Sequence, residues 1–267
     1  LAFRDVDYRC LLSDKFAFAH YLKSLGFPTP PVLAVIDNSK ILWSGDIQPQ
    51  PLRTILDRTR LDCFLKDLTG QCAQGVHRLQ IDNRSISLDN HKISFDKFRD
   101  FLRSAWILQQ TIEQHPMMAL LYPNSVNTIR LVTIYCNGES SPFSALIRIG
   151  AGSNHCDNWA VGGLLGSVDM QSGLISKYCL FKPGFGTRTY KHPETNIIFE
   201  NFSIPFFSQA LSLALALHRF FYGIHSIGWD IAITSTGPVF IEGNDNWEIS
   251  MHQALEGPLK KKFFAAL

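Results

Sequence analysis

Hydrophobic positions recur along this chain at two spacings, one typical of strands and one typical of helices. Apolar or alternating runs predict strands. These runs lie at residues 32–36, 61–66, 106–112, 128–136, 144–149, 163–168, 228–234 and 239–242. Apolar residues three and four apart predict a helix after a Ser13 cap, a helical stripe from Phe95 to Ala105 and a helix at residues 205–222. Because these elements do not alternate as regular βαβ units, the expected fold class is α+β.

Two of the predicted strands form a hairpin. Residues 228–234 and 238–242 flank a turn at residues 235–237, whose last residue is a glycine. Glycine suits the left-handed position of a three-residue hairpin loop. A turn centred on its middle residue makes Thr234 face Pro238 and fixes which residues pair further along the strands.

This hairpin register brings two carboxylates together. Counting outward in steps of two puts Asp230 opposite Glu242, with Asn244 one step further on the same face. Facing Cβ atoms lie about 5 Å apart, a distance at which two bare carboxylates repel each other. A hard cation such as Mg²⁺, which prefers oxygen ligands and shares substrate phosphates, would remove this repulsion. The alternative is an ordinary hairpin with solvated acids on its polar face.

Composition and charge indicate a globular protein. The chain has 267 residues, of which 46% are hydrophobic, so it can build one large domain or two smaller ones. The formal net charge is +2, and the basic run at residues 260–262 is short. Nucleic acid and anionic membranes are therefore not expected as main partners. No apolar run reaches the roughly 20 residues of a membrane span.

Cysteine usage bears on the cellular compartment. The six cysteines form no C-x-x-C pair, and the cluster at residues 155–158 matches no zinc spacing. This usage fits reduced thiols, and we expect a cytoplasmic protein. The chain begins with Leu1 and shows no signal-peptide pattern, as a trimmed segment would.

Lys66 is a candidate phosphate-binding residue. It ends a predicted strand and enters a loop at residues 67–75 that contains Gly70 and Gly75. Loop amides and an ammonium group can bind phosphate oxygens together. The alternative is a surface cation beside a loop, since the chain has no P-loop signature.

Two arginines lie within predicted strands, where a cation needs a reason to be buried. They are Arg130 and Arg148. If residues 137–141 make a turn, both can point into one cleft beside Asp230 and Glu242 and clamp a transferring phosphoryl group. The alternative is a pair of structural ion bridges.

The order of motifs along the chain carries a family resemblance. The motifs are Lys66 with its glycine loop, residues 107–112, Asn127-Thr-Ile-Arg130, Arg148, Asp157-Asn-Trp-Ala-Val-Gly-Gly163, and Asp230 through Glu242-Gly-Asn244. In this order they resemble the ATP-grasp superfamily, and most closely its sugar-transfer-associated branch. The resemblance runs from about residue 12 to residue 257.

The resemblance implies an ATP-grasp fold, in which two α+β subdomains sandwich ATP. Residues 1–30 would form an amino-terminal helix and linker. Residues 31–112 would form the subdomain with the phosphate loop, and residues 113–267 the subdomain with the magnesium site.

The resemblance also assigns roles to individual residues. The implied ATP contacts are Lys66 and the loop from Gly70 to Gly75 at the phosphates, the backbone of Gln110, Thr111 and Ile112 at the adenine, and Glu113 near the ribose. The implied ligands of Mg²⁺, or of Mn²⁺ in its place, are Asp230, Glu242 and Asn244. Arg130 and Arg148 would face the γ-phosphate and the acyl phosphate, and Asn158, Gly162 and Gly163 would shape the acceptor side.

The sequence departs from the family pattern in two respects. Ala73 occupies a loop position often held by glycine, and Gln71-Cys72 is unusual there. The amino-terminal domain that often precedes this fold is nearly absent from the chain. Because that domain commonly helps to bind the substrate, we expect a substrate site that is incomplete or supplied by another chain.

The leading functional hypothesis is an ATP- and Mg²⁺-dependent carboxylate–amine ligase that acts through an acyl phosphate. Its partners would be small-molecule carboxylate and amine substrates, in polysaccharide or glycoconjugate modification. The first alternative is a kinase for a hydroxyl acceptor, which needs a base, and His192 and Asp157 are the candidates. The second is a non-catalytic nucleotide-binding relative. The sequence leaves the donor, the acceptor and the oligomeric state open.

Overall fold

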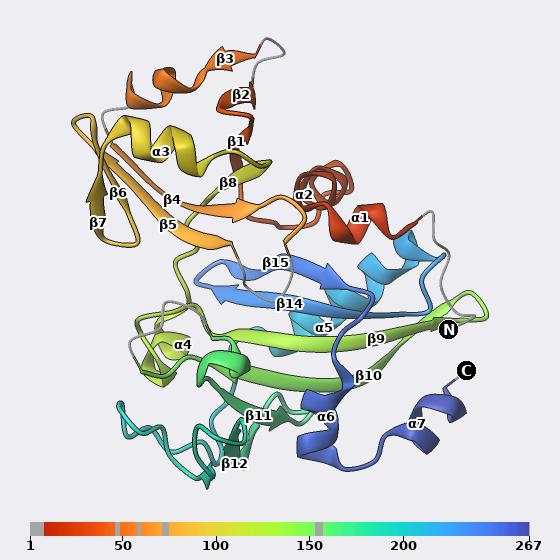
Figure 1. Ribbon diagram of the computed structural model, residues 1–267. Helices are drawn as coiled ribbons and strands as arrows, with labels where there is room; N and C mark the ends of the chain where they lie inside the picture. Colours follow the sequence, from red (N-terminus) through yellow and green to blue (C-terminus); the bar gives the residue numbers. More distant parts are fainter. Residues whose placement is uncertain (1–7, 46–48, 58–59, 71–74, 153–156, 267) are drawn as a thin grey trace. The chain divides into compact units, whose positions relative to one another are not determined.

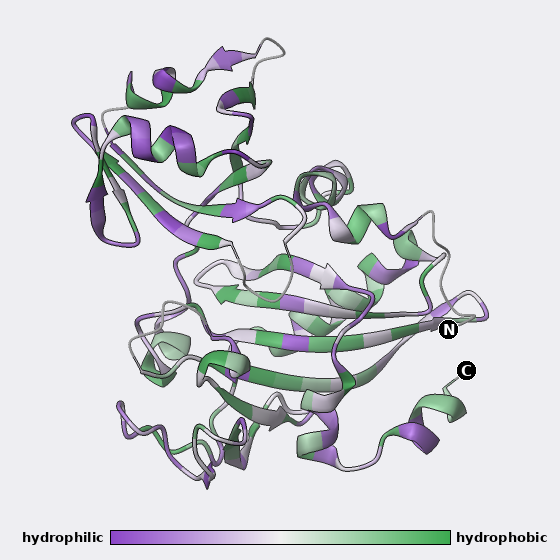
Figure 2. Ribbon diagram, in the orientation of Figure 1, coloured by the Kyte–Doolittle hydropathy of each residue, from purple (hydrophilic) through white to green (hydrophobic). Residues whose placement is uncertain are grey.

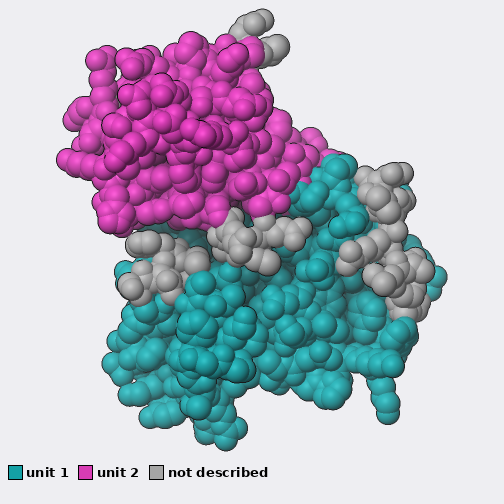
Figure 3. All heavy atoms as spheres, viewed as in Figure 1, with its two compact units in different colours: residues 1–13, 25–28, 112–267 teal, residues 14–24, 29–111 magenta. Residues whose placement is uncertain are grey.

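The computed structural model describes residues 8–45, 49–57, 60–70, 75–152 and 157–266. The chain forms two compact units (Figure 3). Unit 1 comprises residues 1–13, 25–28 and 112–267, and unit 2 comprises residues 14–24 and 29–111. Among the described residues, no helix is long and apolar enough to cross a membrane.

Unit 2 is built on an antiparallel sheet with the strand order β3-β2-β1-β8-β4-β5-β6-β7 (Figure 1). Its strands are β1 Val32–Asp37, β2 Lys40–Trp43, β3 Gln50–Pro51, β4 Arg60–Asp67, β5 Val76–Asp82, β6 Ser85–Leu88, β7 His91–Ile93 and β8 Trp106–Gln110. Its helices are α2 Lys15–Ser24 and α3 Phe95–Phe101, and a 3₁₀ turn spans Leu52–Asp57.

The first long helix begins one residue later than expected. Ser13 belongs to the short helix α1, Cys10–Ser13, in unit 1. The cap of α2 is Asp14, whose Oδ1 accepts hydrogen bonds from the amides of Phe16 and Ala17, each at 2.8 Å. A carboxylate caps as well as a hydroxyl and also interacts favourably with the helix dipole.

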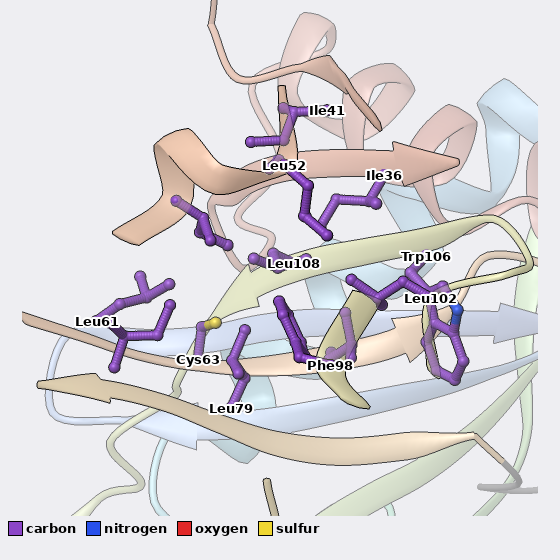
Figure 4. Close-up of a cluster of buried hydrophobic side chains, with 14 of the residues drawn as sticks. Ile36, Ile41, Leu52, Leu61, Cys63, Leu79, Phe98, Leu102, Trp106 and Leu108 are labelled. Carbon is purple, nitrogen blue, oxygen red and sulfur yellow. The ribbon is translucent and has the colours of Figure 1, made fainter. Parts of the chain in front are cut away.

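Helix α3 supplies part of the hydrophobic core of unit 2. Its cap Ser94 accepts a hydrogen bond from the amide of Lys97. Phe98 and the C-cap residue Leu102 are fully buried in a cluster with strand residues such as Leu79 (Figure 4). Burying each such side chain contributes about 1.5–3 kcal/mol to folding. Ala105, the last residue of the predicted stripe, lies beyond the helix end.

Strands β5, β6 and β7 were not expected from the sequence. Two tight turns connect them, Asn83-Arg84 and Asp89-Asn90, and all four residues have positive φ. Two-residue hairpin turns require this backbone conformation, which usually selects glycine. Asn83, Asp89 and Asn90 tolerate this conformation, but without a glycine the turn signal in the sequence is weaker.

Unit 1 is built on a second antiparallel sheet, with the order β13-β12-β11-β10-β9-β14-β15. Its strands are β9 Thr128–Cys136, β10 Glu139–Ile149, β11 Leu164–Val168, β12 Ile175–Phe181, β13 Arg188–Thr189, β14 Ser226–Thr234 and β15 Gly237–Asn244. Its helices besides α1 are α4 Pro116–Leu121, α5 Phe207–His218, α6 Ile249–Glu256 and α7 Lys260–Ala265, and 3₁₀ turns span Trp159–Val161 and Arg219–Phe221.

The two faces of this sheet are covered differently. Helix α5 packs on one face through Ala210, Ala214 and Leu217, which share one side of the helix and are buried. On the other face Val132 of β9 packs against Trp247, which precedes α6. Figure 2 shows β9 as mostly hydrophobic, with hydrophilic positions within it. Arg130 is the charged residue of this strand.

The hairpin of β14 and β15 reaches the expected pairing by an unexpected route. Its turn has two residues rather than three, and Thr234 pairs with Gly237 instead of the expected Pro238. This shift alone would move every later pair by one position. A β-bulge at Ile241 adds one unpaired residue to β15, so Asp230 pairs with Glu242 as expected.

Candidate active site

Four charged residues share one face of the unit 1 sheet. Asp230 lies directly opposite Arg130 on one side and Glu242 on the other. Arg148 lies two residues from Leu146, the partner of Arg130 on β10. Because directly opposed residues point to the same face, all four side chains lie on the face away from α5.

Arg130 is buried and bound to Asp230. Its side chain is 6% exposed. Its Nε and Nη2 donate to the two carboxylate oxygens, with 3.0 Å between Nη2 and Oδ2, and its Nη1 donates to the carbonyl of Trp247 at 3.1 Å. Three of the five N–H donors of the guanidinium are thereby used. This geometry makes Arg130 a residue that positions Asp230.

Arg148 is the more accessible arginine, with a side chain 15% exposed. Its Nη2 donates to Asp230 Oδ2 at 2.8 Å and its Nε to Thr128 Oγ1 at 3.0 Å. Asp157 Oδ2 lies 3.5 Å from the same Nε. Burial lowers the pKa of Arg148, but the carboxylates of Asp157 and Asp230 outweigh burial and raise it. Arg148 therefore remains a cation that a ligand can approach.

The two facing carboxyl groups have opposite pKa shifts. Burial alone would raise the pKa of Asp230, but Arg130 and Arg148 hold it well below its usual range. Burial and the neighbouring Asp230 charge raise the pKa of Glu242. Asp230 is thus ionised, and Glu242 is the group that an additional cation would stabilise in its charged form.

The oxygen atoms of Asp230, Glu242 and Asn244 fit a hard divalent cation. Asp230 and Glu242 supply carboxylate oxygens, and Asn244 donates its Nδ2 to Glu242 Oε1 at 3.3 Å, so its amide oxygen is the end suited to a metal. Arginine N–H groups occupy about three of the four acceptor positions of Asp230. The described residues contain no cluster of three or more His, Cys, Asp or Glu that could hold a metal. A cation at this point would need oxygens from a substrate to complete its shell, as Mg²⁺ commonly does.

The turn that follows Asp157 positions that carboxylate. Asp157 accepts hydrogen bonds from the amide and hydroxyl of Thr128, and burial raises its pKa more than Arg148 and Thr128 lower it. Asn158 caps the turn by accepting from the amide of Ala160 at 2.9 Å. A Cβ at Gly163 would lie 2.7 Å from the carbonyl oxygen of Asp157. These contacts explain the spacing of the motif, while its role at an acceptor stays a prediction.

Gly162 ends this turn in the left-handed region, with a φ of 104°. Glycine adopts this conformation without strain, whereas other residues rarely do. The glycine pair at residues 162 and 163 therefore has one member required by backbone conformation and one required by close packing.

Asn127 and Thr128 support the site, although no role was predicted for either residue individually. The buried Asn127 donates from Nδ2 to Gln114 Oε1, the Met118 carbonyl and the Tyr122 carbonyl. Its Oδ1 accepts from the amide of Gly150 at 3.1 Å. The signal that could have identified them is the position of two small polar residues at the start of an apolar strand.

The predicted phosphate-binding residues lie in unit 2. Lys66 is half-buried in β4, opposite Val76 of β5. The carbonyl of Gly70 accepts from Lys15 Nζ at 2.5 Å, and the carbonyl of Gly75 accepts from the amide of Asp67 at 2.8 Å. The intervening residues 71–74, which include the unusual Gln71, Cys72 and Ala73, lie outside the described residues.

The predicted adenine and ribose contacts follow β8. This strand was expected to reach residue 112 but ends at Gln110, whose amide donates to the carbonyl of Pro31 at 2.9 Å. Thr111 and Ile112 are half-buried and Glu113 is exposed. Their contact with a nucleotide stays a prediction.

His192, one of two candidate bases for a kinase, has a structural role here. It is fully buried, and its Nε2 lies 2.8 Å from the carbonyl oxygen of Gly150. Its Nδ1 accepts hydrogen bonds from the amides of Glu194 and Thr195. Burial lowers its pKa. With both ring nitrogens engaged, His192 is poorly suited to accept a proton from a substrate.

Comparisons with known proteins give one family and two informative structures. The family model described as sugar-transfer associated ATP-grasp matches residues 5–262. The ADP complex of PurK, an N5-carboxyaminoimidazole ribonucleotide synthetase, is 12% identical, with a TM-score of 0.52 over 90% of this chain and 51% of that one. The ATP-grasp ligase PsnB, complexed with minimal precursor, Mg and ADP, is 12% identical, with a TM-score of 0.50 over 99% of this chain and 61% of that one. The chain thus spans about half to three fifths of their lengths, and no curated protein matches its sequence.

Proposed function

Because the chain belongs to the sugar-transfer associated ATP-grasp family, we propose that it is an ATP- and Mg²⁺-dependent carboxylate–amine ligase. The family match and the two structures with TM-scores of 0.52 and 0.50 confirm the α+β ATP-grasp fold that the motifs indicated. The likeness to solved structures concerns the fold alone. The reaction rests on the charged residues of unit 1.

One observation carries the proposal. A buried, ionised Asp230 is held by two arginines, and Glu242 faces it with a raised pKa. A bound Mg²⁺ would stabilise the charged form of Glu242 and neutralise phosphate oxygens during transfer. Glu242, Asn244 and the remaining acceptor position of Asp230 would hold this ion. Mn²⁺ satisfies the same ligand preference.

In the proposed reaction a substrate carboxylate attacks the γ-phosphorus of ATP and ADP leaves. The resulting acyl phosphate is attacked by an amine, which loses a proton and displaces inorganic phosphate to form an amide. Arg148 would stabilise the negative charge that spreads over the transferring group, and Arg130 would keep Asp230 in place. The family description suggests substrates connected with sugar transfer.

The Glu242→Gln variant tests this proposal. It keeps the shape of the side chain and removes one anionic metal ligand, so we expect Mg²⁺-dependent ADP formation to be lost while the circular dichroism spectrum is unchanged. Glu139→Gln, at an exposed position in β10 of the same unit, is the matched control and should retain turnover. The assay measures ADP and inorganic phosphate over a panel of carboxylates and amines. Normal Mg²⁺-dependent turnover by Glu242→Gln would exclude this metal site.

The kinase alternative makes a different product. A kinase leaves the phosphoryl group on a hydroxyl acceptor, whereas a ligase releases inorganic phosphate in step with an amide. Of the two candidate bases, His192 has both nitrogens engaged and Asp157 is bound to Thr128 and Arg148. These contacts favour the ligase. A phosphorylated acceptor in the product mixture would favour the kinase instead.

A further inference from the structure

The segment around β12 and β13 combines cations with exposed aromatic rings. Residues 170–193 contain four Lys and Arg side chains and no Asp or Glu. Tyr178, Phe185 and Tyr190 are 39%, 54% and 50% exposed. Exposed aromatic residues interleaved with cations are typical of surfaces that bind anionic ligands.

Two of these cations lie over aromatic rings. The guanidinium of Arg188 lies 4.9 Å from the ring centroid of Tyr178, and Lys182 Nζ lies 5.9 Å from that of Trp159. Neither cation pairs with a carboxylate within the described part of the chain. An arginine that stacks on a ring uses the face of its planar guanidinium. The N–H groups along the edge can then donate to the two oxygens of a carboxylate or phosphate.

The strand register places these cations on the same face as the proposed reaction site. Arg148 lies opposite Leu165, Leu165 opposite Leu180, and Leu180 opposite Arg188. Residues paired in this way point to one face, and three strand spacings separate the Cα atoms of Arg148 and Arg188 by roughly 14 Å. Lys182 follows the end of β12, and its Nζ lies over the ring of Trp159, which packs with Leu165 on this face.

Direct packing also connects the loop after β12 to the site. Arg148 lies 3.5 Å from Asp157, which begins the turn that ends at Gly162. A Cβ on Gly162 would lie 3.2 Å from Cδ1 of Phe185, so this ring rests against the turn. The loop that carries Phe185 lies between Lys182 and Arg188 in the sequence and is therefore fixed beside the turn.

We infer that Lys182 and Arg188 form a subsite for an oxyanion, either carboxylate or phosphate, on an extended substrate whose reacting end lies at Arg148. This inference rests on the proposed function for the location of the reacting end. It defines the substrate class as one that carries a second anionic group roughly 14 Å from the reacting group. Tyr178 and Phe185 contribute apolar surface beside that group.

Direct binding of small anions to the full-length chain tests the inference. The probes are tetraglutamate, whose extended length of roughly 14 Å matches the spacing, neutral tetraglutamine, and inorganic phosphate. NMR titrations of the ¹⁵N-labelled protein measure the dissociation constants and locate the affected amides. We expect tetraglutamate to bind more tightly than tetraglutamine, with shifts at residues 177–190.

The Arg188→Gln and Lys182→Gln variants should each weaken tetraglutamate binding by about threefold to tenfold, as expected for a partly exposed charge-assisted contact. Phosphate binding with the same dependence on Arg188, tighter than that of tetraglutamate, would identify phosphate as the oxyanion. Lys191→Gln is the control, because Lys191 Nζ already donates to Asn196 Oδ1 at 3.0 Å, and it should leave affinity unchanged.

Three results would overturn the inference. These are equal binding of tetraglutamine, unchanged affinity in both variants, and an equal loss in Lys191→Gln. Because binding is measured without turnover, these outcomes are independent of the Glu242→Gln assay. If ATP turnover fails but binding depends on Arg188, the subsite stands and the ligase proposal falls.

Discussion

Replacing Asp230 with asparagine removes an anion that two arginines share. The Asp230 side chain is 1% exposed, Arg130 is 6% exposed and Arg148 is 15% exposed. In the variant Arg130 keeps its bond to the Trp247 carbonyl and loses its only salt-bridge partner among the described residues. The substitution therefore leaves a buried cation without a partner, which is far more costly than the loss of a surface pair.

The structure sets the size of the effect. Breaking a buried ion pair from one side costs about 3–5 kcal/mol. The lower part of this range applies, because Arg148 keeps Asp157 at 3.5 Å and is partly exposed. For a unit of this size the loss lowers the melting temperature by about 2–4 °C per kcal/mol, or roughly 10 °C in total. The buried contacts therefore predict a clear loss of stability for Asp230→Asn.

Unit 2 offers a pair with the same geometry and greater exposure. Arg78 donates from Nε and Nη2 to the two oxygens of Asp62 at 3.0 and 2.8 Å, and the two side chains are 38% and 35% exposed. Asp62→Asn should therefore cost less than about 1 kcal/mol. Urea unfolding followed by near-ultraviolet circular dichroism compares the variants. Equal losses for Asp230→Asn and Asp62→Asn would refute the argument from burial.

Three further predictions concern unit 1. The pKa of His218 is lowered from 6.5 to about 4, chiefly by burial, so its contribution to stability is complete above pH 6.5 and is lost as pH falls toward 4. The loss reaches about 3 kcal/mol, and His218→Gln should flatten the pH profile of urea unfolding; an unchanged slope would contradict this. Gly163→Ala should lower the free energy of unfolding by more than about 2 kcal/mol, because the added Cβ would lie 2.7 Å from the Asp157 carbonyl oxygen. Gly184→Ala meets only backbone strain and should cost about 1 kcal/mol. Equal losses for the two variants in thermal unfolding would disprove the clash. Asn127→Leu should cost about 3 kcal/mol, because it leaves buried carbonyl groups unpaired, and a melting temperature within 2 °C of the parent would contradict that role.

The sequence predicted most of the strands that carry the site, because their apolar runs are long. β9 has the expected bounds, residues 128–136, and β14 begins two residues early. The approach of Arg148 to Asp157 could not be predicted in the same way. It depends on the pairing of β9 with β10, which shifts at residues 142–144, and on a turn closed by glycine packing. Neither feature leaves a periodic pattern in the sequence.

In the charged cluster, too, the strand pattern predicted which residues face each other, whereas their burial depends on tertiary packing. The register placed Asp230 opposite Glu242 correctly, and their side chains share the face that includes both arginines. The sequence left open whether the arginines bind a phosphoryl group or form structural ion bridges. The structure separates the two residues, because Arg130 is buried in contacts with Asp230 and Trp247 while Arg148 is more exposed. Burial decides this difference, and burial depends on α6 and the segment before it, which the apolar pattern did not indicate.

The bulge at Ile241 makes the site sensitive to the parity of the hairpin length. With the observed two-residue turn and no bulge, Asp230 would face Ile241, and Glu242 would point to the side of the sheet that α5 covers. Deleting Ile241 alone would remove the bulge and leave Glu242 opposite Asp230, whereas deleting two residues between the turn and Glu242 would turn the carboxylate toward the apolar core. Homologous chains with the same two-residue turn and no bulge should thus have one residue fewer between the turn and this glutamate. Deleting Ile241 alone should therefore be far less harmful than deleting Phe240 and Ile241 together.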